Sequence, residues 1–376
     1  MTQKKLIKLY FIIVTILLLP LPTFNSLLFV LDNQNEIDFN KKTLFSTDKL
    51  EGTINYLSYK TAKYSFNKGQ AIIGKDGFLF LGNDYNRVLD KVQNKFLYTK
   101  KDIDIWTDKL KKLQLWYENR GIKFVIVVAP NKHTVYKDKL PNWIKTTNKT
   151  ITNDIVLYSK NKNIHILYLR DIIIKENKSQ LYFLTDTHWN NKGASIGYKE
   201  TIKFINKTYL TKYKIADYSL TTTRQGAGDL ANFLKITSLL PKNYETNYKF
   251  NIINESKICQ GFINKNHTLE KCNLKKNIAI NINAKDQFII NNKSLNKDRL
   301  LLLCDSFGGA NSKPYNETFN TIWKFHYGHI NGQPLKSFID KHKPDIVIYQ
   351  IVERALYNFG IVKMLPTISG RVPQVS

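Results

Sequence analysis

The feature that most constrains the fold is a helix-to-strand transition in the first half of the chain. Residues 101–120 place apolar side chains at helical spacing, and the following Gly121 is a typical residue for the end of a helix. The continuous apolar run KFVIVVA comes next, at residues 123–129, and leads into a polar loop. A buried strand between a helix and a loop is typical of a parallel sheet covered by helices. The sequence therefore predicts the α/β class.

The same alternation returns in the last third of the chain, where RLLLLCDSFGGA predicts a strand, a turn and a helix. Residues 241–298 differ, because they are rich in Asn and Lys and contain only short alternating runs, so we interpret them as a β-rich insertion or subsidiary sheet. The main folded domain is predicted to span residues 71–357, after a linker at 33–70 and before a tail at 358–376. This domain begins with AIIGKDGFLFLGN, which predicts a β-hairpin around a Lys-Asp-Gly turn.

The N-terminus combines positive charge with a long apolar run. Lys4, Lys5 and Lys8 precede the apolar residues 9–31, which suffice to cross a bilayer of about 30 Å at about 1.5 Å per residue. Prolines interrupt the run, so a cleaved signal peptide is the alternative, but no pair of small residues suitable for cleavage lies nearby. We interpret residues 1–32 as an uncleaved signal anchor that leaves the rest of the chain outside the cytoplasm.

The formal net charge of +27 comes from 57 basic and 30 acidic residues. The excess is nearly all Lys and is scattered, which indicates compositional drift, with attraction to anionic lipid or an acidic glycan as the alternative. Because the N-terminus indicates export, we expect no nucleic-acid partner. Among the cysteines, Cys259 and Cys272 lie in a polar region and are candidates for a disulfide outside the cytoplasm, whereas Cys304 lies in an apolar run. No Cys/His array is present, so we expect no metal site.

A candidate nucleophile follows the apolar run at residues 300–304. Ser306 would lie at the carboxyl end of a parallel strand, where open α/β sheets bind ligands, and the backbone N–H groups of Ser306 and its neighbours could stabilise an oxyanion. The segment TDTHW supplies a base in His188 and, two residues earlier, an acid in Asp186 that could orient it. Taken singly, the serine could instead cap a helix, and the Asp-x-His pair could be a polar turn or a metal pair.

These motifs and their order resemble the SGNH-hydrolase-like acetyltransferases of the alginate O-acetylation (AlgJ/AlgX) family. The resemblance rests on IIGKDGFLFLGND, VIVVAPNKHTVYKDKLP, TDTHWNNKGA, GDLA, LLLCDSFGGA and KPDIVIYQIVER. In ordinary SGNH hydrolases the serine block comes first, so the motif order here is permuted, as in this family. The resemblance implies an SGNH-like parallel sheet flanked by helices, with Ser306 as nucleophile, His188 as base and Asp186 as orienting acid, and with no cofactor. The family usually has Gly where this chain has Cys304.

Further residues near these motifs are weaker candidates for substrate binding. Asp305, which the resemblance implies would shape the turn, and Gly308 flank the serine, and Lys132 and Arg354 follow predicted strands, so all four are expected at the same edge of the sheet. A solvated Lys132, and a salt bridge from Arg354 to Glu353 or Asp345, are the alternatives.

The resemblance implies an O-acetyltransferase that acts on a cell-surface or secreted polysaccharide. It would be anchored in the inner membrane, with the catalytic domain in the periplasm or extracytoplasmic space. Its implied partner is a polytopic membrane O-acyltransferase that supplies acetyl groups across the bilayer. Two alternatives remain at this point: a carbohydrate acetylesterase that uses the same triad with water, and an inactive glycan-binding scaffold.

Overall fold

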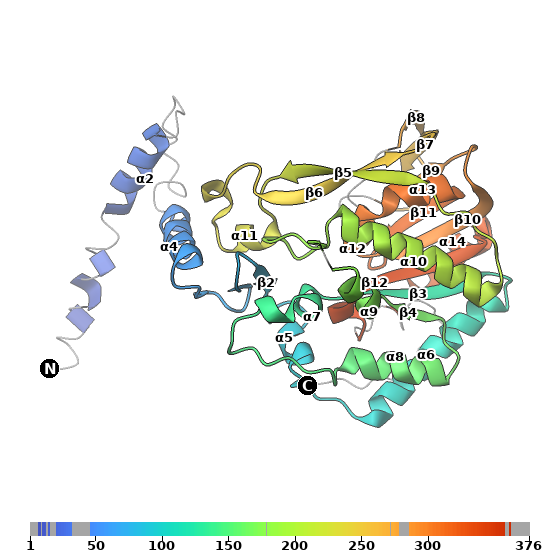
Figure 1. Ribbon diagram of the computed structural model, residues 1–376, viewed down its shortest axis with the longest axis horizontal. Helices are drawn as coiled ribbons and strands as arrows, with labels where there is room; N and C mark the ends of the chain where they lie inside the picture. The colour runs from blue at the N-terminus through green and yellow to red at the C-terminus, as the bar shows by residue number, and fades with distance from the viewer. Residues whose placement is uncertain are drawn as a thin grey trace.

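The computed structural model describes residues 7–8, 10–12, 14–15, 20–31, 46–177, 179–270, 272–277, 286–357 and 361. The main strands are β3 (Lys123–Ala129), β4 (Ile166–Tyr168), β7 (Lys257–Phe262), β8 (Asn273–Lys276), β9 (Gln287–Ile290), β10 (Asn296–Cys304), β11 (Phe319–His326) and β12 (Ile346–Val352). Within the described ranges they form one eight-stranded sheet in the order β4-β3-β12-β10-β11-β9-β7-β8 (Figure 1). The apolar runs that predicted strands at residues 123–129 and 300–304 lie at its centre.

The sheet is mixed rather than parallel. From β4 to β11 all neighbouring strands are parallel, which confirms the α/β class. Beyond β11 the strands β9, β7 and β8 pair antiparallel, so the expectation of a parallel sheet is wrong for this half. These strands come from the segment 241–298 and extend the main sheet. Parallel neighbours need a long crossover, usually a helix, whereas these strands follow one another with no helix between them among the described residues.

Helices cover both faces of the sheet. The α-helices are α2 (Pro20–Leu31), α4 (Asp48–Lys60), α5 (Val88–Val92), α6 (Lys100–Glu118), α7 (Lys132–Val135), α8 (Ile151–Asn161), α9 (Arg170–Lys175), α10 (Asn191–Tyr209), α11 (Asp229–Phe233), α12 (Phe307–Ala310), α13 (Ser312–Thr318) and α14 (Gly332–His342). Short 3₁₀ helices are η1 (Lys137–Lys139), η2 (Thr237–Leu239) and η3 (Glu353–Ala355). On one face α6 and α14 pack through Tyr117 on Phe124 and Phe338 on Phe325, while α10, α12 and α13 lie on the other (Figure 1).

The predicted helix at 101–120 is α6, and its ends show why it forms there. Thr99 and Asp102 make a reciprocal capping box, in which each side chain accepts from the backbone N–H of the other. At the other end, Gly121 has φ +70°, a conformation that favours glycine. The aromatic rings of Tyr117 and Phe124 then stack at 4.7 Å between centroids, which fixes the helix against β3.

Two antiparallel ribbons lie outside the main sheet. The predicted hairpin is confirmed as β1 (Ala71–Ile73) paired with β2 (Leu79–Leu81), and Asp76 and Gly77 take positive φ at its turn. The second ribbon pairs β5 (Tyr218–Gln225) with β6 (Glu245–Ile252), so the first strand of the expected insertion does not join the main sheet. Both ribbons contribute contacts to the site described below.

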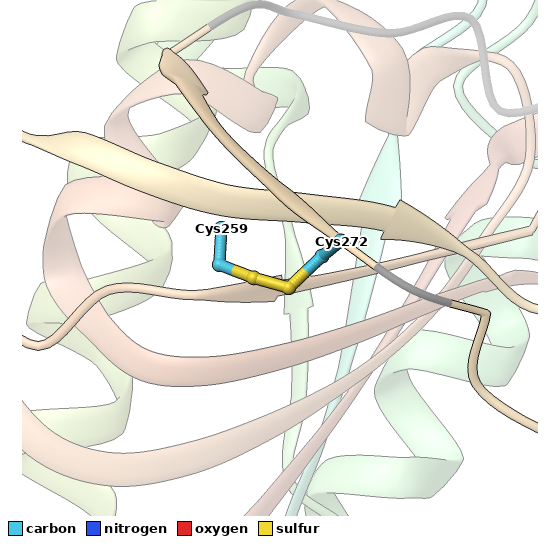
Figure 2. The surroundings of a disulfide bond; sticks show 2 residues. All are labelled: Cys259 and Cys272. Atoms are coloured by element: carbon cyan, nitrogen blue, oxygen red, sulfur yellow. A yellow bond between two sulfur atoms is a disulfide. The ribbon is translucent and has the colours of Figure 1, made fainter.

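Two further expectations from the sequence concern a disulfide and a membrane anchor. Cys259 in β7 and Cys272 just before β8 form a disulfide, with Cα atoms 5.4 Å apart, that links the outer strands of the sheet (Figure 2). Among the described residues, no helix is long and apolar enough to span a membrane. The predicted anchor at 1–32 is described only in part, and most of the predicted tail at 358–376 lies outside the described residues.

Candidate active site

Two loops distant in sequence meet at the carboxyl end of β10. Ser306 follows that strand and directly precedes α12, and its side chain is half-buried. The second loop runs from Tyr182 to Trp189, which form an isolated bridge, and leads into α10. The indole N–H of Trp189 donates to the carbonyl of Phe307 at 3.0 Å and so ties the two loops together. The sheet therefore places the serine block beside the Asp-x-His block.

The structure brings Asp186, His188 and Ser306 into one hydrogen-bonded chain. His188 Nε2 lies 2.6 Å from Ser306 Oγ, and His188 Nδ1 lies 2.6 Å from Asp186 Oδ1. Asp186 Oδ1 also accepts from the backbone N–H of His188 at 2.8 Å, which fixes the carboxylate behind the ring. This is the arrangement of a serine nucleophile, a general base and an acid that orients the base.

A second carboxylate, which the sequence reasoning missed, supports the same histidine. Asp229 Oδ2 lies 3.8 Å from His188 Nδ1, and its two oxygens accept from the backbone N–H and the hydroxyl of Thr187. The backbone N–H of Asp229 donates to Asp186 Oδ2 at 3.2 Å. Asp229 belongs to the motif GDLA at residues 228–231, but a motif in the sequence does not show that the Asp229 carboxylate faces the histidine.

The charges of these groups shift their pKa values in a consistent pattern. Burial by itself lowers the pKa of His188, but the hydrogen bond to Asp186 and the negative charges of Asp186 and Asp229 raise it above its usual value. Burial acts to raise the pKa of Asp186, yet its hydrogen bonds, chiefly with His188, lower it to about 2. Asp186 is therefore ionised at neutral pH and can only accept, so the proton of a neutral His188 resides on Nδ1. The lone pair on Nε2 then faces the Ser306 hydroxyl.

The loop that carries Asp186 is held by two buried charged side chains. Lys132 Nζ donates to the carbonyls of Leu79 at 2.7 Å, Leu184 at 2.6 Å and Asp186 at 3.1 Å. From the other side, the Glu245 carboxylate accepts from the backbone N–H of Leu184 at 2.8 Å, and from the N–H and hydroxyl of Thr185. Lys132 is the first residue of α7, shortly after β3, and Glu245 is the first residue of β6 in the β5–β6 ribbon.

Three of the candidates for substrate binding are buried and make contacts within the protein. Lys132 is 2% exposed and its ammonium group is occupied by the three carbonyls, so it is a tether within the protein. The buried Asp305 carboxylate accepts from the backbone N–H of Phe307 at 3.0 Å and of Val352 at 2.7 Å, and so shapes the turn. Gly308 is buried, and a Cβ there would lie 2.3 Å from the sulfur of Cys304. The cysteine that departs from the usual family residue thus fits because residue 308 has no side chain.

The backbone N–H groups near the serine are mostly occupied. Phe307 donates to the Asp305 carboxylate, Gly308 to the Asp305 carbonyl at 3.0 Å, and Gly309 to the Ser306 carbonyl at 3.2 Å. In the described chain, the N–H of Ser306 itself has no acceptor. The expectation that several neighbouring N–H groups point at an oxyanion therefore narrows to one.

The same cluster also contains the donor atoms of a metal site, because ligand atoms of Asp186, His188 and Asp229 lie within 4.8 Å of one another. A metal ion would have to bind at His188 Nδ1, which would require removing the proton shared with Asp186. The short contact from Nε2 to Ser306 favours the proton-transfer arrangement. The cluster thus fits general base catalysis better than metal coordination.

The comparisons with known proteins agree with this geometry. Residues 71–256 match the family model of the SGNH hydrolase-like domain of the acetyltransferase AlgX. This match includes the hairpin, the Asp186–His188 loop and the GDLA motif. It ends before Ser306, so the family model does not cover the serine, which is brought to the Asp186–His188 loop by the folded sheet. No curated protein matches the chain.

Among solved structures, the chain is similar to Bacillus cereus PatB1. The TM-score is 0.57 to the form with a sulfonyl adduct, at 17% identity over 78% of this chain and 97% of that one. The other PatB1 structure gives 0.55, at 18% identity over 79% and 96%. A DHHW family protein from Eubacterium siraeum also gives 0.55, at 15% identity over 79% and 99%. At these identities the likeness concerns the fold. Residues 71–256 of this chain therefore belong to the family of AlgX-type SGNH hydrolase-like acetyltransferase domains.

Proposed function

We propose that this protein is an O-acetyltransferase that carries an acetyl group on Ser306 and delivers it to a hydroxyl of a polysaccharide. The observation that carries the proposal is the continuous chain from Asp186 through His188 to Ser306, with both hydrogen bonds at 2.6 Å. The side chain of His188 is 26% exposed, and Ser306 is half-buried, so the reacting atoms are accessible to a ligand. The acetyltransferase description of the family supports the reaction class.

The reaction follows from the positions of these atoms. Ser306 Oγ attacks the acetyl carbonyl carbon while its proton moves to His188 Nε2, and the carbonyl electron pair moves onto oxygen. When the intermediate collapses, the bond to the donor oxygen breaks and the leaving group takes the proton from His188. A sugar hydroxyl then attacks the acetyl-serine, gives its proton to His188, and Ser306 leaves with that proton. The two half-reactions predict ping-pong kinetics.

The proposal extends to location and partner. The disulfide between Cys259 and Cys272 fits an oxidising compartment, and the apolar N-terminal run fits a membrane anchor. We therefore place the catalytic domain on the outer side of the inner membrane of the cell envelope. Because activated acetyl donors such as thioesters are made inside the cell, the donor would be a polytopic membrane O-acyltransferase that passes acetyl groups across the bilayer.

A labelling experiment tests the nucleophile. A fluorophosphonate probe should modify the wild-type protein in the presence of EDTA and fail to modify Ser306→Ala. Ser219→Ala is the matched control, because Ser219 lies exposed on β5. Labelling that survives in Ser306→Ala, or that needs a divalent metal, would refute the proposed nucleophile, and no labelling of any variant would favour an inactive scaffold.

A second experiment separates transfer from hydrolysis. The domain is incubated with p-nitrophenyl acetate, with and without a candidate glycan. Acetylated glycan and faster release of p-nitrophenol in its presence support the transferase. Free acetate at the same rate with or without glycan would instead indicate a carbohydrate esterase that uses the same residues with water.

A further inference from the structure

Arg354 lies in η3, directly after β12, and β12 pairs with β10, the strand that leads to the serine. Its backbone is fixed on both sides, because its N–H donates to Asn131 Oδ1 at 3.3 Å and its carbonyl accepts from Lys91 Nζ at 2.7 Å. Neither salt bridge considered from the sequence occurs. Asp345 pairs with Arg299 at 2.9 Å, and the buried Glu353 carboxylate accepts from the Asn131 N–H and the Thr134 hydroxyl.

The guanidinium group of Arg354 is left with unused hydrogen-bonding capacity. In the part of the chain that the structure describes, it makes no hydrogen bond and no ion pair, although guanidinium has five N–H donors. Its central carbon lies 5.7 Å from the centre of the Phe307 ring, next in sequence to Ser306. The ring of His188 lies 5.0 Å from the same Phe307 ring. The guanidinium and the catalytic imidazole therefore share one aromatic neighbour.

Electrostatics also places Arg354 among the groups of the site. Burial is the main influence on the pKa of Asp305 and raises it, and the positive charge of Arg354 opposes that increase. The positive charge of Arg354 also acts to lower the pKa of His188. Burial lowers the pKa of Arg354 itself, and the negative charges of Asp305 and Asp229 oppose that decrease. The side chain is only half-buried, so a ligand can reach it. Arg354 is therefore an unpaired cation that shares the Phe307 ring with the imidazole of His188.

The proposed reaction creates a negative charge that the backbone near the serine can meet with only one free N–H, that of Ser306. We propose that Arg354 is a catalytic residue that donates the second hydrogen bond to the oxyanion. This inference rests on the proposed function. As Ser306 Oγ bonds to the acetyl carbon, the carbonyl electron pair moves to oxygen, and the guanidinium N–H donates to that oxygen without transferring a proton. On collapse, the pair returns to the carbonyl and the hydrogen bond weakens.

The magnitude follows from comparable groups. Removing one donor to an oxyanion costs about 10²–10³-fold in the rate of the chemical step, because the donor is positioned before the charge appears. The substrate ester has a weaker partial charge on the same oxygen. The loss should therefore appear in the acylation rate at saturation and only weakly in KM.

The test uses p-nitrophenyl acetate, a neutral ester with no carboxylate. Arg354→Gln should slow the release of p-nitrophenol about 10²–10³-fold, with KM changed less than about threefold, and Arg354→Lys should recover part of the rate. Arg224→Gln is the control, because Arg224 lies exposed on β5 and donates to the hydroxyl of Thr246. Arg354→Ala with millimolar ethylguanidinium provides a chemical rescue: the added cation should restore activity in this variant and leave Arg354→Lys unchanged.

Several outcomes would overturn the inference. If Arg354→Gln keeps the wild-type rate with the neutral ester, the oxyanion role is excluded, and a raised KM for an anionic glycan would then assign Arg354 to acceptor binding. If circular dichroism shows that Arg354→Gln is unfolded, the rescue of Arg354→Ala becomes the deciding measurement, and absence of rescue there counts against the role. Persistence of the reaction in Ser306→Ala would instead defeat the proposed function itself, independently of Arg354.

Discussion

Gly228 provides a sharp test of whether the position of Asp186 matters. A Cβ added at residue 228 would lie 2.2 Å from Asp186 Cβ and 2.4 Å from Asp186 Oδ2. Ordinary contact begins at 3.4 Å, so the two backbones must separate by about 1.2 Å, because turning the carboxylate leaves Asp186 Cβ in place. This separation displaces the carboxylate, which now makes a 2.6 Å hydrogen bond with His188.

The expected magnitudes for Gly228→Ala differ between activity and stability. A displacement of about 1 Å in a catalytic arrangement can cost about 10²-fold in rate, so acylation by p-nitrophenyl acetate should fall by that order. Overpacking a buried contact costs about 1–3 kcal/mol, which thermal or urea unfolding can measure. Gly226→Ala is the matched control, because its Cβ would meet only the Lys242 carbonyl at 3.6 Å.

The reasoning fails in two ways that these assays distinguish. A folded Gly228→Ala with the wild-type acylation rate would mean that the position of Asp186 is unimportant, and the proposed triad would lose its third member. Equal losses in Gly226→Ala and Gly228→Ala would mean that the loop is sensitive to any added methyl group. A large loss of stability with normal activity per folded molecule would make Gly228 a packing residue only.

Three further predictions concern the charges and the disulfide. Asp186→Asn should reduce acylation by about 10⁴-fold, since the amide NH2 can donate to His188 Nδ1 and so favour the wrong imidazole tautomer. Asp229→Asn should reduce it by only about 10-fold, because the Asp229 carboxylate lies 3.8 Å from the ring; equal losses would contradict the assignment of the orienting acid. Burial lowers the pKa of His188, but Asp186 and Asp229 raise it by more, so the net pKa lies above 6.5 and the imidazole is protonated and inactive below it. The acylation rate should therefore rise with pH through this pKa, and the midpoint of the profile should move to lower pH in Asp229→Asn. Cys272→Ser should lower the free energy of unfolding by about 2–3 kcal/mol for this short loop and leave acylation unchanged. A reducing agent should destabilise the wild type by the same amount and should not destabilise the variant further.

The local elements were predictable because they follow from periodicity. The helix before Gly121, the strand that ends at Cys304 and the turn at Gly77 each depend on a few neighbouring residues. The antiparallel half of the sheet was not, because the short alternating runs in 241–298 give strand character but carry no information about the partner strand. The same segment supplies β6 to one ribbon and β7, β8 and β9 to the sheet.

The residues of the site were also predictable only in part. The meeting of Asp186, His188 and Ser306 could be predicted because each is a residue type that catalysis uses, placed at the end of a predicted strand or next to a turn. The role of Lys132 could not, because a lysine in a polar loop normally indicates a solvated side chain. Its burial depends on three carbonyls, one at Leu79 in the hairpin and two, at Leu184 and Asp186, in a loop distant in sequence. Such a contact set exists only after the chain has folded.

Lys132 and Glu245 explain how a loop without regular secondary structure can hold Asp186, the proposed orienting acid, in place. Both are buried, at 2% and 0% exposure, and burial lowers the pKa of Lys132 to about 7 while the Glu245 charge opposes that decrease. Buried charges are costly unless both partners are present, so removing either leaves the other uncompensated. Lys132→Met and Glu245→Gln should each lower the free energy of unfolding and slow acylation.

The double variant distinguishes a coupled pair from two independent anchors. If the two charges compensate each other across the Leu184–Asp186 loop, Lys132→Met combined with Glu245→Gln should cost about 1–3 kcal/mol less in unfolding free energy than the sum of the single changes. Acylation should stay slow in the double variant, because the hydrogen bonds that orient Asp186 are still missing. Additive unfolding costs would show independent anchors. Recovery of acylation together with stability would show that charge balance, and not the fixed position of the loop, governs the rate.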